Sequence, residues 1–144
     1  MKQVTQQRNI PVTGSYDVVV CGGGPAGWIA AVAAARSGAK TALIEQFGFV
    51  GGMATAGLVL PISVFTYNGK LVCGGIPWEF VQRMEKAQGA QVEKPLGNVA
   101  HDPEIYKLIA QRMLLEAGVE LHLHCTITGC LHQGGHLTHV IFDT

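Results

Sequence analysis

The chain has 144 residues, of which 48% are hydrophobic and only 14% are charged. Ten basic and ten acidic side chains cancel, so no positive excess favours nucleic acid or an anionic membrane surface as a partner. A chain of this length and apolar character is typical of one globular domain in which helices cover a sheet.

The chain begins with a polar stretch, and we expect residues 1–15 to form a flexible lead-in to a folded domain over residues 16–144. The uncharged run from Val18 to Ala35 is long enough to suggest a membrane helix. Three glycines and a proline at 22–25 interrupt it, so a strand, a turn and a helix explain it better. We therefore expect no targeting segment, no membrane partner and a cytoplasmic location.

Residues 17–27 read Asp-Val-Val-Val-Cys-Gly-Gly-Gly-Pro-Ala-Gly, which predicts a β-branched strand, a glycine turn and the start of a helix. Gly22 permits the tight turn, Gly24 lets a pyrophosphate approach the backbone, and Gly27 lets the helix pack closely on the sheet. The free N–H groups and the positive dipole end at the N-terminus of this helix suit an anion.

A second strand follows the helix and ends at Glu45, 18 residues after Gly27. An acid at this place can accept hydrogen bonds from ribose hydroxyls. Ala31 and Ala35 continue the small-residue face of the helix from Gly27, and Gly38 is suited to end it. Together these features favour a dinucleotide-binding βαβ unit over a glycine turn with a purely structural role.

The segment 46–57 is long, apolar and rich in glycine, unlike an ordinary connecting loop. Because it directly follows the predicted ribose acid, we interpret it as backbone wrapped around a large ligand rather than a loop that only packs on the sheet. Residues 58–65 are expected to form a short strand or an extended wall, and 67–70 a tight turn.

Caps and apolar spacing predict two further helices. Pro77 suits the first turn of a helix over residues 76–86. The predicted apolar face of this helix consists of Ile76, Phe80, Val81 and Met84. Asp102 and Pro103 suit the N-cap and first position of a helix that Gly118 would end. Its predicted apolar face consists of Ile105, Leu108, Ile109 and Met113.

The C-terminal part alternates apolar and polar residues over 119–125 and then reads as a β-hairpin over 126–132 and 137–142. The cysteines form no C-x-x-C pair, and we expect buried small hydrophobic residues rather than disulfide partners at Cys21, Cys73, Cys125 and Cys130. The six histidines have no acid or cysteine at a recognisable ligand spacing, so no metal site is predicted.

Residues 16–27, together with Leu43-Ile-Glu45, Gly51-Gly-Met-Ala-Thr55 and Asp102-Pro-Glu104, resemble the N-terminal part of the FAD-dependent oxidoreductases of the two-dinucleotide-binding-domain flavoprotein superfamily. The resemblance implies an α/β, Rossmann-like FAD/NAD(P)-binding domain with a parallel sheet and an added β-hairpin. It also implies hydride transfer between an unknown small substrate and the flavin. Family members normally continue into an Ala-Thr-Gly-Asp type segment and a substrate-binding portion, so we expect a truncated, incomplete domain.

The resemblance also implies roles at matching positions. The turn and the first helical residues would hold the FAD pyrophosphate, the acid and its neighbour the adenosine ribose, the following loop the phosphate and flavin side, and one backbone position in the hairpin the adenine. The residues expected to bind FAD are therefore Gly22, Gly24, Pro25, Ala26, Gly27, Glu45, Gln46, Gly52, Met53, Ala54 and Ile127.

Two alternatives stay open at this point. An NAD-binding dehydrogenase domain would also use Glu45, although the long apolar loop and the hairpin favour FAD. A truncated nucleotide-binding module without catalytic activity would bind a cofactor without turnover. No catalytic residue is visible, and His101, Tyr67 and Trp78 are candidates only for pocket lining. The expected partner is a small-molecule substrate, and a homo-oligomer is left open.

Overall fold

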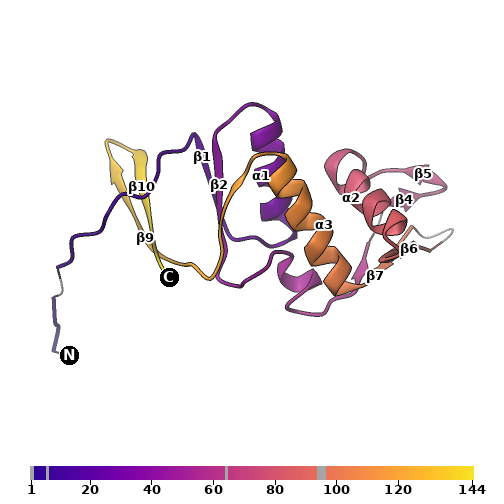
Figure 1. The fold of residues 1–144 in the computed structure, drawn as a ribbon, viewed down its shortest axis with the longest axis horizontal. Helices are drawn as coiled ribbons and strands as arrows, with labels where there is room; N and C mark the ends of the chain where they lie inside the picture. The colour runs from indigo at the N-terminus through magenta and orange to yellow at the C-terminus, as the bar shows by residue number, and fades with distance from the viewer. Residues whose placement is uncertain (1, 6, 64, 94–96) are drawn as a thin grey trace.

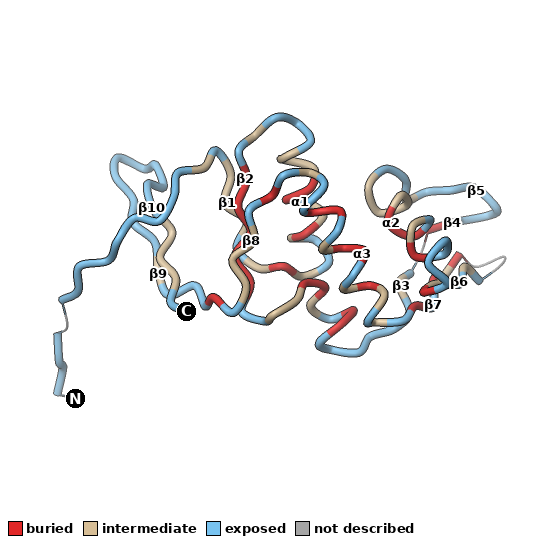
Figure 2. The backbone as a smooth tube through the Cα atoms, viewed as in Figure 1, coloured by how far each residue is buried: buried red, intermediate tan, exposed pale blue. Residues whose placement is uncertain are grey.

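The structure is a computed structural model, and it describes residues 2–5, 7–63, 65–93 and 97–144 (Figure 1). The N-terminal segment extends away from the folded part of the chain, and its described residues before Tyr16 are exposed (Figure 2). The predicted lead-in therefore has no regular secondary structure where it is described; residues 1 and 6 lie outside the described residues.

A three-stranded parallel sheet lies at the centre of the fold. Its strands are β1 (Val18–Cys21), β2 (Thr41–Ile44) and β8 (Glu120–His122), in the order β1-β2-β8. Helix α1 (Pro25–Arg36) connects β1 to β2, and the Gly38 backbone has a φ of +93° just after the helix end. The predicted βαβ unit is thus confirmed, and all four residues of its middle strand, β2, are buried.

Helices α1 and α3 (Pro103–Glu116) lie side by side and share one hydrophobic core with the sheet (Figures 1 and 2). The side chains of Trp28, Leu43 and Met113 are fully buried in this core. Burial on this scale, at about 25 cal/mol per Å² of apolar surface, is the main source of stability for such a layer. The core therefore fixes the position of α1 relative to the carboxyl end of β1.

A second group of elements packs on the far side of the helices. It contains α2 (Gly75–Lys86), the antiparallel sheet β3 (Pro61–Ile62), β7 (Val99–His101) and β6 (Ala90–Val92), and the small hairpin β4 (Thr66–Tyr67) and β5 (Lys70–Leu71). The turn predicted at 67–70 is the turn of this hairpin. The stretch expected as a strand or wall over 58–65 contributes only β3, and residue 64 lies outside the described residues.

The C-terminal hairpin of β9 (Thr126–Gln133) and β10 (His136–Asp143) confirms the prediction for this part of the chain. It lies at the opposite end of the molecule from α2, next to β1 (Figure 1). Most of its residues are exposed. The hairpin adds to the α/β fold without contributing to the main core.

Helix α3 begins as predicted, but its buried face differs from the expected one. One carboxylate oxygen of Asp102 accepts hydrogen bonds from the Glu104 and Ile105 backbone N–H groups, at 2.7 and 3.1 Å. Leu108 was expected on the buried face but is 44% exposed, whereas Tyr106 is 2% exposed. The buried stripe is centred on Tyr106 because its ring packs against the aromatic residues of α1 and α2. For α2, the predicted burial of Phe80, Val81 and Met84 is confirmed.

An ion-pair network on the surface links α1, α2 and α3. Arg36 of α1 donates two hydrogen bonds to Glu79 of α2, at 2.6 and 3.0 Å. Glu79 also pairs with Arg83, and Arg83 in turn contacts Glu116 of α3 at 2.6 Å. The hydrogen bond from Arg36 lowers the pKa of Glu79 below its usual value. Because these side chains are between about one third and one half exposed, solvent screening keeps their contribution to stability small.

Glu79→Gln tests this network. The lowered pKa means that the Glu79 carboxylate stabilises the fold above its unfolded-state pKa of about 4.3 and loses this contribution as pH falls through the folded-state pKa. We expect the variant to be less stable than the parent by at most about 1 kcal/mol at pH 7, with the difference shrinking below about pH 4. Urea unfolding at pH 7 and below about pH 4 measures the difference in the free energy of unfolding between variant and parent. Glu85→Gln on the same helix is the control. A difference that does not change with pH would contradict the prediction.

Candidate functional site

The glycine turn after β1 has the backbone geometry that its sequence requires. Gly22 has a φ of +101°, which favours glycine, and its N–H donates to the Ile44 carbonyl at 2.8 Å. A Cβ at position 27 would overlap the Gly22 carbonyl oxygen. Helix α1 therefore starts in direct contact with the turn, and this contact needs a glycine at each of the two positions.

The N-terminus of α1 is free to receive an anion. Gly24 is the N-cap, and no side chain caps the helix there among the described residues. A Cβ on Gly24 would have no described atom within 4 Å, and Pro25 and Ala26 in the first turn are exposed. Uncapped N–H groups beside open space are the features that bind phosphate at a helix N-terminus.

Glu45 directly follows β2 and is only 6% exposed. One carboxylate oxygen accepts a hydrogen bond from the Gly23 N–H at 2.6 Å, and the other accepts from the Phe47 N–H at 2.8 Å. The carboxylate thus ties the glycine turn to the loop after β2, a role that sequence reasoning missed. Each oxygen keeps lone-pair capacity for a further donor, and Gln46 lies exposed beside it.

The predicted glycine-rich loop lies against the turn and contains a short 3₁₀ helix, η1 (Gly52–Ala54). The Gly51 N–H donates to the Gly23 carbonyl at 2.8 Å. A Cβ on Gly52 would lie 3.0 Å from the Cα of Gly24, so the two backbones approach closely. Ala54 is buried and Met53 is 62% exposed. The structure therefore brings the turn and the loop together, as the sequence interpretation requires.

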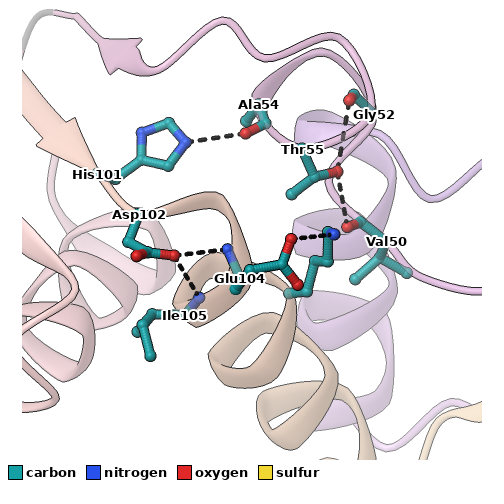
Figure 3. Close-up of polar contacts among 9 residues, drawn as sticks. Val50, Gly52, Ala54, Thr55, His101, Asp102, Glu104 and Ile105 are labelled. Atoms are coloured by element: carbon teal, nitrogen blue, oxygen red, sulfur yellow. Dashed lines mark hydrogen bonds and ion pairs between the residues drawn. The ribbon is translucent and has the colours of Figure 1, made fainter.

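The loop is held by side chains from its own end and from β7 (Figure 3). The Thr55 hydroxyl donates to the Val50 carbonyl at 3.1 Å. His101, which is 7% exposed, places Nε2 2.9 Å from the Ala54 carbonyl oxygen. A carbonyl oxygen only accepts, so Nε2 carries the hydrogen. Nδ1 of the same ring is buried and has no hydrogen-bond partner among the described residues.

The residues just before the hairpin contact the loop after β2 through the backbone. The His124 N–H donates to the Phe47 carbonyl at 3.1 Å, and the Cys125 N–H donates to the Glu45 carbonyl at 2.9 Å. Ile127 lies two residues beyond this junction and is 39% exposed. The backbone contacts place the start of β9 beside Glu45.

The expectation of four buried cysteines is wrong for three of them. Cys125 is buried, Cys73 is half-buried, and Cys21 and Cys130 are exposed, all as free thiols. Cys21 is the last residue of β1, the edge strand of the sheet, and Cys130 lies on β9, most of whose residues are exposed. Partial burial, with a smaller effect of the Cys130 charge, raises the pKa of the Cys21 thiol. Across the described parts of the chain, no three metal-binding side chains come together.

Comparison with known proteins gives a family match over most of the chain. A family model described as FAD dependent oxidoreductase matches residues 17–144. The chain is 52% identical over 46 residues to a dihydrolipoyl dehydrogenase of Trypanosoma brucei brucei, and 39% identical over 56 residues to one of Acholeplasma laidlawii. These matches cover 32% and 39% of this chain but only 10% and 16% of the two relatives.

Solved structures show the same fold. Thioredoxin reductase of Lactococcus lactis superposes with a TM-score of 0.51 at 27% identity, over 90% of this chain and 31% of the other. THI4 of Thermovibrio ammonificans gives a TM-score of 0.59 at 18% identity, over 89% of this chain and 47% of the other. The predicted Rossmann-like α/β fold is confirmed, and the chain spans less than half the length of these structures.

Glu45→Ala tests the brace between the turn and the loop. It removes two hydrogen bonds from a carboxylate and leaves the Gly23 and Phe47 N–H groups without their acceptor. We expect a loss of about 1–3 kcal/mol in the free energy of unfolding, measured by urea denaturation without ligand. Gln46→Ala at the exposed neighbour is the control and should change little. Equal stability of parent and Glu45→Ala would contradict the role of this carboxylate as a brace.

His101→Leu and His101→Gln form a matched pair for the loop contact. Leucine leaves the buried Ala54 carbonyl without a donor, which costs about 1–3 kcal/mol, whereas glutamine can still donate a hydrogen bond. We expect the leucine variant to unfold at lower urea and to exchange the loop amide hydrogens faster. The same loss in both variants would show that ring packing, rather than the hydrogen bond, holds the loop.

Proposed function

The chain belongs to the FAD dependent oxidoreductase family, and from this premise we propose that its glycine turn holds the FAD pyrophosphate in an enzyme that transfers a hydride between a small-molecule substrate and the flavin. The observation that carries the proposal is the uncapped N-terminus of α1 behind Gly24. It offers N–H donors and a positive dipole end, no described side chain caps it, and the space around position 24 is open.

The neighbouring residues fit the rest of the cofactor. We assign the pyrophosphate to the backbone of Gly22 and Gly24 and to the first turn of α1, Pro25 to Gly27. Glu45 retains lone-pair capacity for the adenosine ribose hydroxyls, and Gln46 is exposed next to it. A carboxylate here suits a free 2′-hydroxyl and repels a 2′-phosphate.

The loop and the hairpin supply the remaining assignments. Gly52, Met53 and Ala54 border the turn and would line the phosphate and flavin side. The backbone at Ile127, just past the junction of the hairpin with Glu45, would contact the adenine. These roles are consistent with one elongated ligand that runs from the hairpin, past the ends of β1 and β2, to the loop.

These positions separate what the cofactor would contribute from what the protein would contribute. FAD supplies the redox chemistry when bound. The chain orients it, neutralises phosphate charge with backbone dipoles, and holds the loop through His101. The family match favours FAD over the NAD-binding domain that the sequence left open. We assign no acid or base within this chain, so its turnover on its own stays a prediction to test.

The proposed partner is a small-molecule substrate, with no role for nucleic acid or a membrane. The equal numbers of acidic and basic residues support this choice. Among the described residues, none of the helices combines the length and apolar character needed to cross a bilayer. The cytoplasmic location and a homo-oligomeric state stay predictions.

Gly24→Val tests the pyrophosphate site. The valine side chain would fill the approach to the α1 N-terminus, while the open space around position 24 lets the fold persist. We expect FAD affinity to fall tenfold or more, at least about 1.4 kcal/mol, in a flavin fluorescence titration with unchanged circular dichroism. Ala30→Val, at an exposed position of the same helix, is the matched control. Equal FAD affinity of Gly24→Val and the parent would exclude the turn as the pyrophosphate site.

A direct measurement of the cofactor complements this variant. We expect the purified chain, after incubation with FAD and desalting, to keep a visible flavin absorbance band. Retention would show that these residues hold a sufficient site, and electron donors could then be screened for turnover. A chain that retains neither FAD nor NAD would contradict the proposal that its own residues bind the cofactor.

A further inference from the structure

A pocket of about 160 Å³ lies beside α1, on the side of the helix that faces α2 and β3. Trp28 of α1, Phe80 of α2 and Tyr106 of α3 form its aromatic wall. Ile62 and Phe65 line it from the segment before α2, and Cys73 lines it from the residues just before that helix. The pocket is thus built from elements that the core already holds in place.

The walls of the pocket are apolar. No charged residue lines it within the described part of the chain. The Trp28 indole N–H donates to the Tyr106 hydroxyl at 3.0 Å, so this buried N–H has its acceptor. The Phe80 ring packs edge-to-face on both, with centroid distances of 4.8 Å to Trp28 and 4.6 Å to Tyr106. A charged ligand group would lose its hydration here without compensation.

The size of the pocket limits what it can hold. An apolar cavity of about 150 Å³ is known to accept benzene, so 160 Å³ suits a group of about that size. Pockets for a whole drug-sized ligand are larger, about 300–1,000 Å³. This pocket therefore fits one apolar part of a larger molecule rather than the entire molecule.

The pocket also adjoins the proposed cofactor site. Pro25 lines it and is at the same time the first residue of α1, directly after Gly24. Gly52 of the glycine-rich loop lies against the same two residues. A group in the pocket is thus within one helical turn of the residues assigned to the pyrophosphate.

We propose that this pocket receives an uncharged apolar group, about the size of a benzene ring, from the small-molecule substrate. The proposal rests on the proposed function for the existence of a substrate, but the pocket itself is defined without FAD. It assigns the substrate class by shape and polarity: a molecule that carries a compact aromatic or branched aliphatic group.

Cys73 provides the test, because its half-buried thiol lines the pocket. The full chain is alkylated with iodoacetamide, and the rate at each cysteine is followed by peptide mass spectrometry. We expect millimolar phenol to slow the alkylation of Cys73 at least threefold, whereas benzoate, which is charged, has no effect. Cys21 and Cys130 are exposed and do not line the pocket, so their rates serve as internal controls and should not change.

A pair of variants separates occupancy from general effects. Ser63 is exposed and lines the pocket, so Ser63→Phe should fill it, slow the alkylation of Cys73 without phenol, and abolish the effect of phenol. Ser15→Phe, in the exposed N-terminal segment, is the matched control and should behave as the parent. Circular dichroism of both variants checks that they fold, and we expect spectra equal to that of the parent.

The remaining outcomes overturn the proposal. Equal slowing at all three cysteines, protection by benzoate as strong as by phenol, or no protection at all would show that the pocket does not select an apolar group. Protection of Cys73 by FAD alone would place the flavin ring there and exclude the substrate. The phenol and benzoate measurements need no bound FAD, so a failed FAD titration would count against the proposed function and leave their result for the pocket intact.

Discussion

The contact between the start of α1 and the turn after β1 is the constraint on which the rest of the site depends. A Cβ at position 27 would overlap the Gly22 carbonyl oxygen, so the helix reaches the sheet only because residue 27 is glycine. This contact places the helix N-terminus at the carboxyl edge of the sheet, where open α/β sheets bind their ligands. The loop around Gly52 and the carboxylate of Glu45 then pack against the same turn. One close approach of backbone thus assembles elements that lie far apart in the sequence.

The site is also pre-organised by polar contacts within the protein. A buried carboxylate is costly unless it is hydrogen-bonded, and Glu45 meets this requirement with the Gly23 and Phe47 N–H groups. The same bonds orient the turn and the loop before any ligand arrives, which lowers the entropy cost of binding. His101 holds the other end of the loop from β7, so the loop is fixed from two independent elements. Among the described residues, Nδ1 of His101 has no hydrogen-bond partner, so this support lacks one hydrogen bond that the ring could make.

The sequence predicts well those features that depend on local rules. The βαβ unit, the α3 cap at Asp102 and the C-terminal hairpin all follow from glycine, proline and side-chain periodicity within short windows. It does not predict β6 and β7, because strands of three residues show no measurable alternation and exist through pairing with each other. The hydrogen bond between His101 and Ala54 joins residues 47 positions apart, so no local sequence pattern predicts it. The predicted burial of Leu108 is wrong because helical spacing shows how often a buried position recurs but not which side of the helix faces the core. The packing of the Tyr106 ring decides which side that is.

The first turn of α1 separates two environments of opposite character. At its end, backbone N–H groups face open space and attract negative charge. On its side, Pro25 and Trp28 begin an apolar wall in which the Trp28 N–H already has its acceptor. A molecule that places an anion at the helix end and a compact apolar group at its side would satisfy both environments. The reverse arrangement would bury the anion against the apolar wall, where it loses its hydration and has no partner for its charge. The geometry of one helix start therefore supports the assignment of phosphate to the glycine turn and of an uncharged group to the pocket beside it.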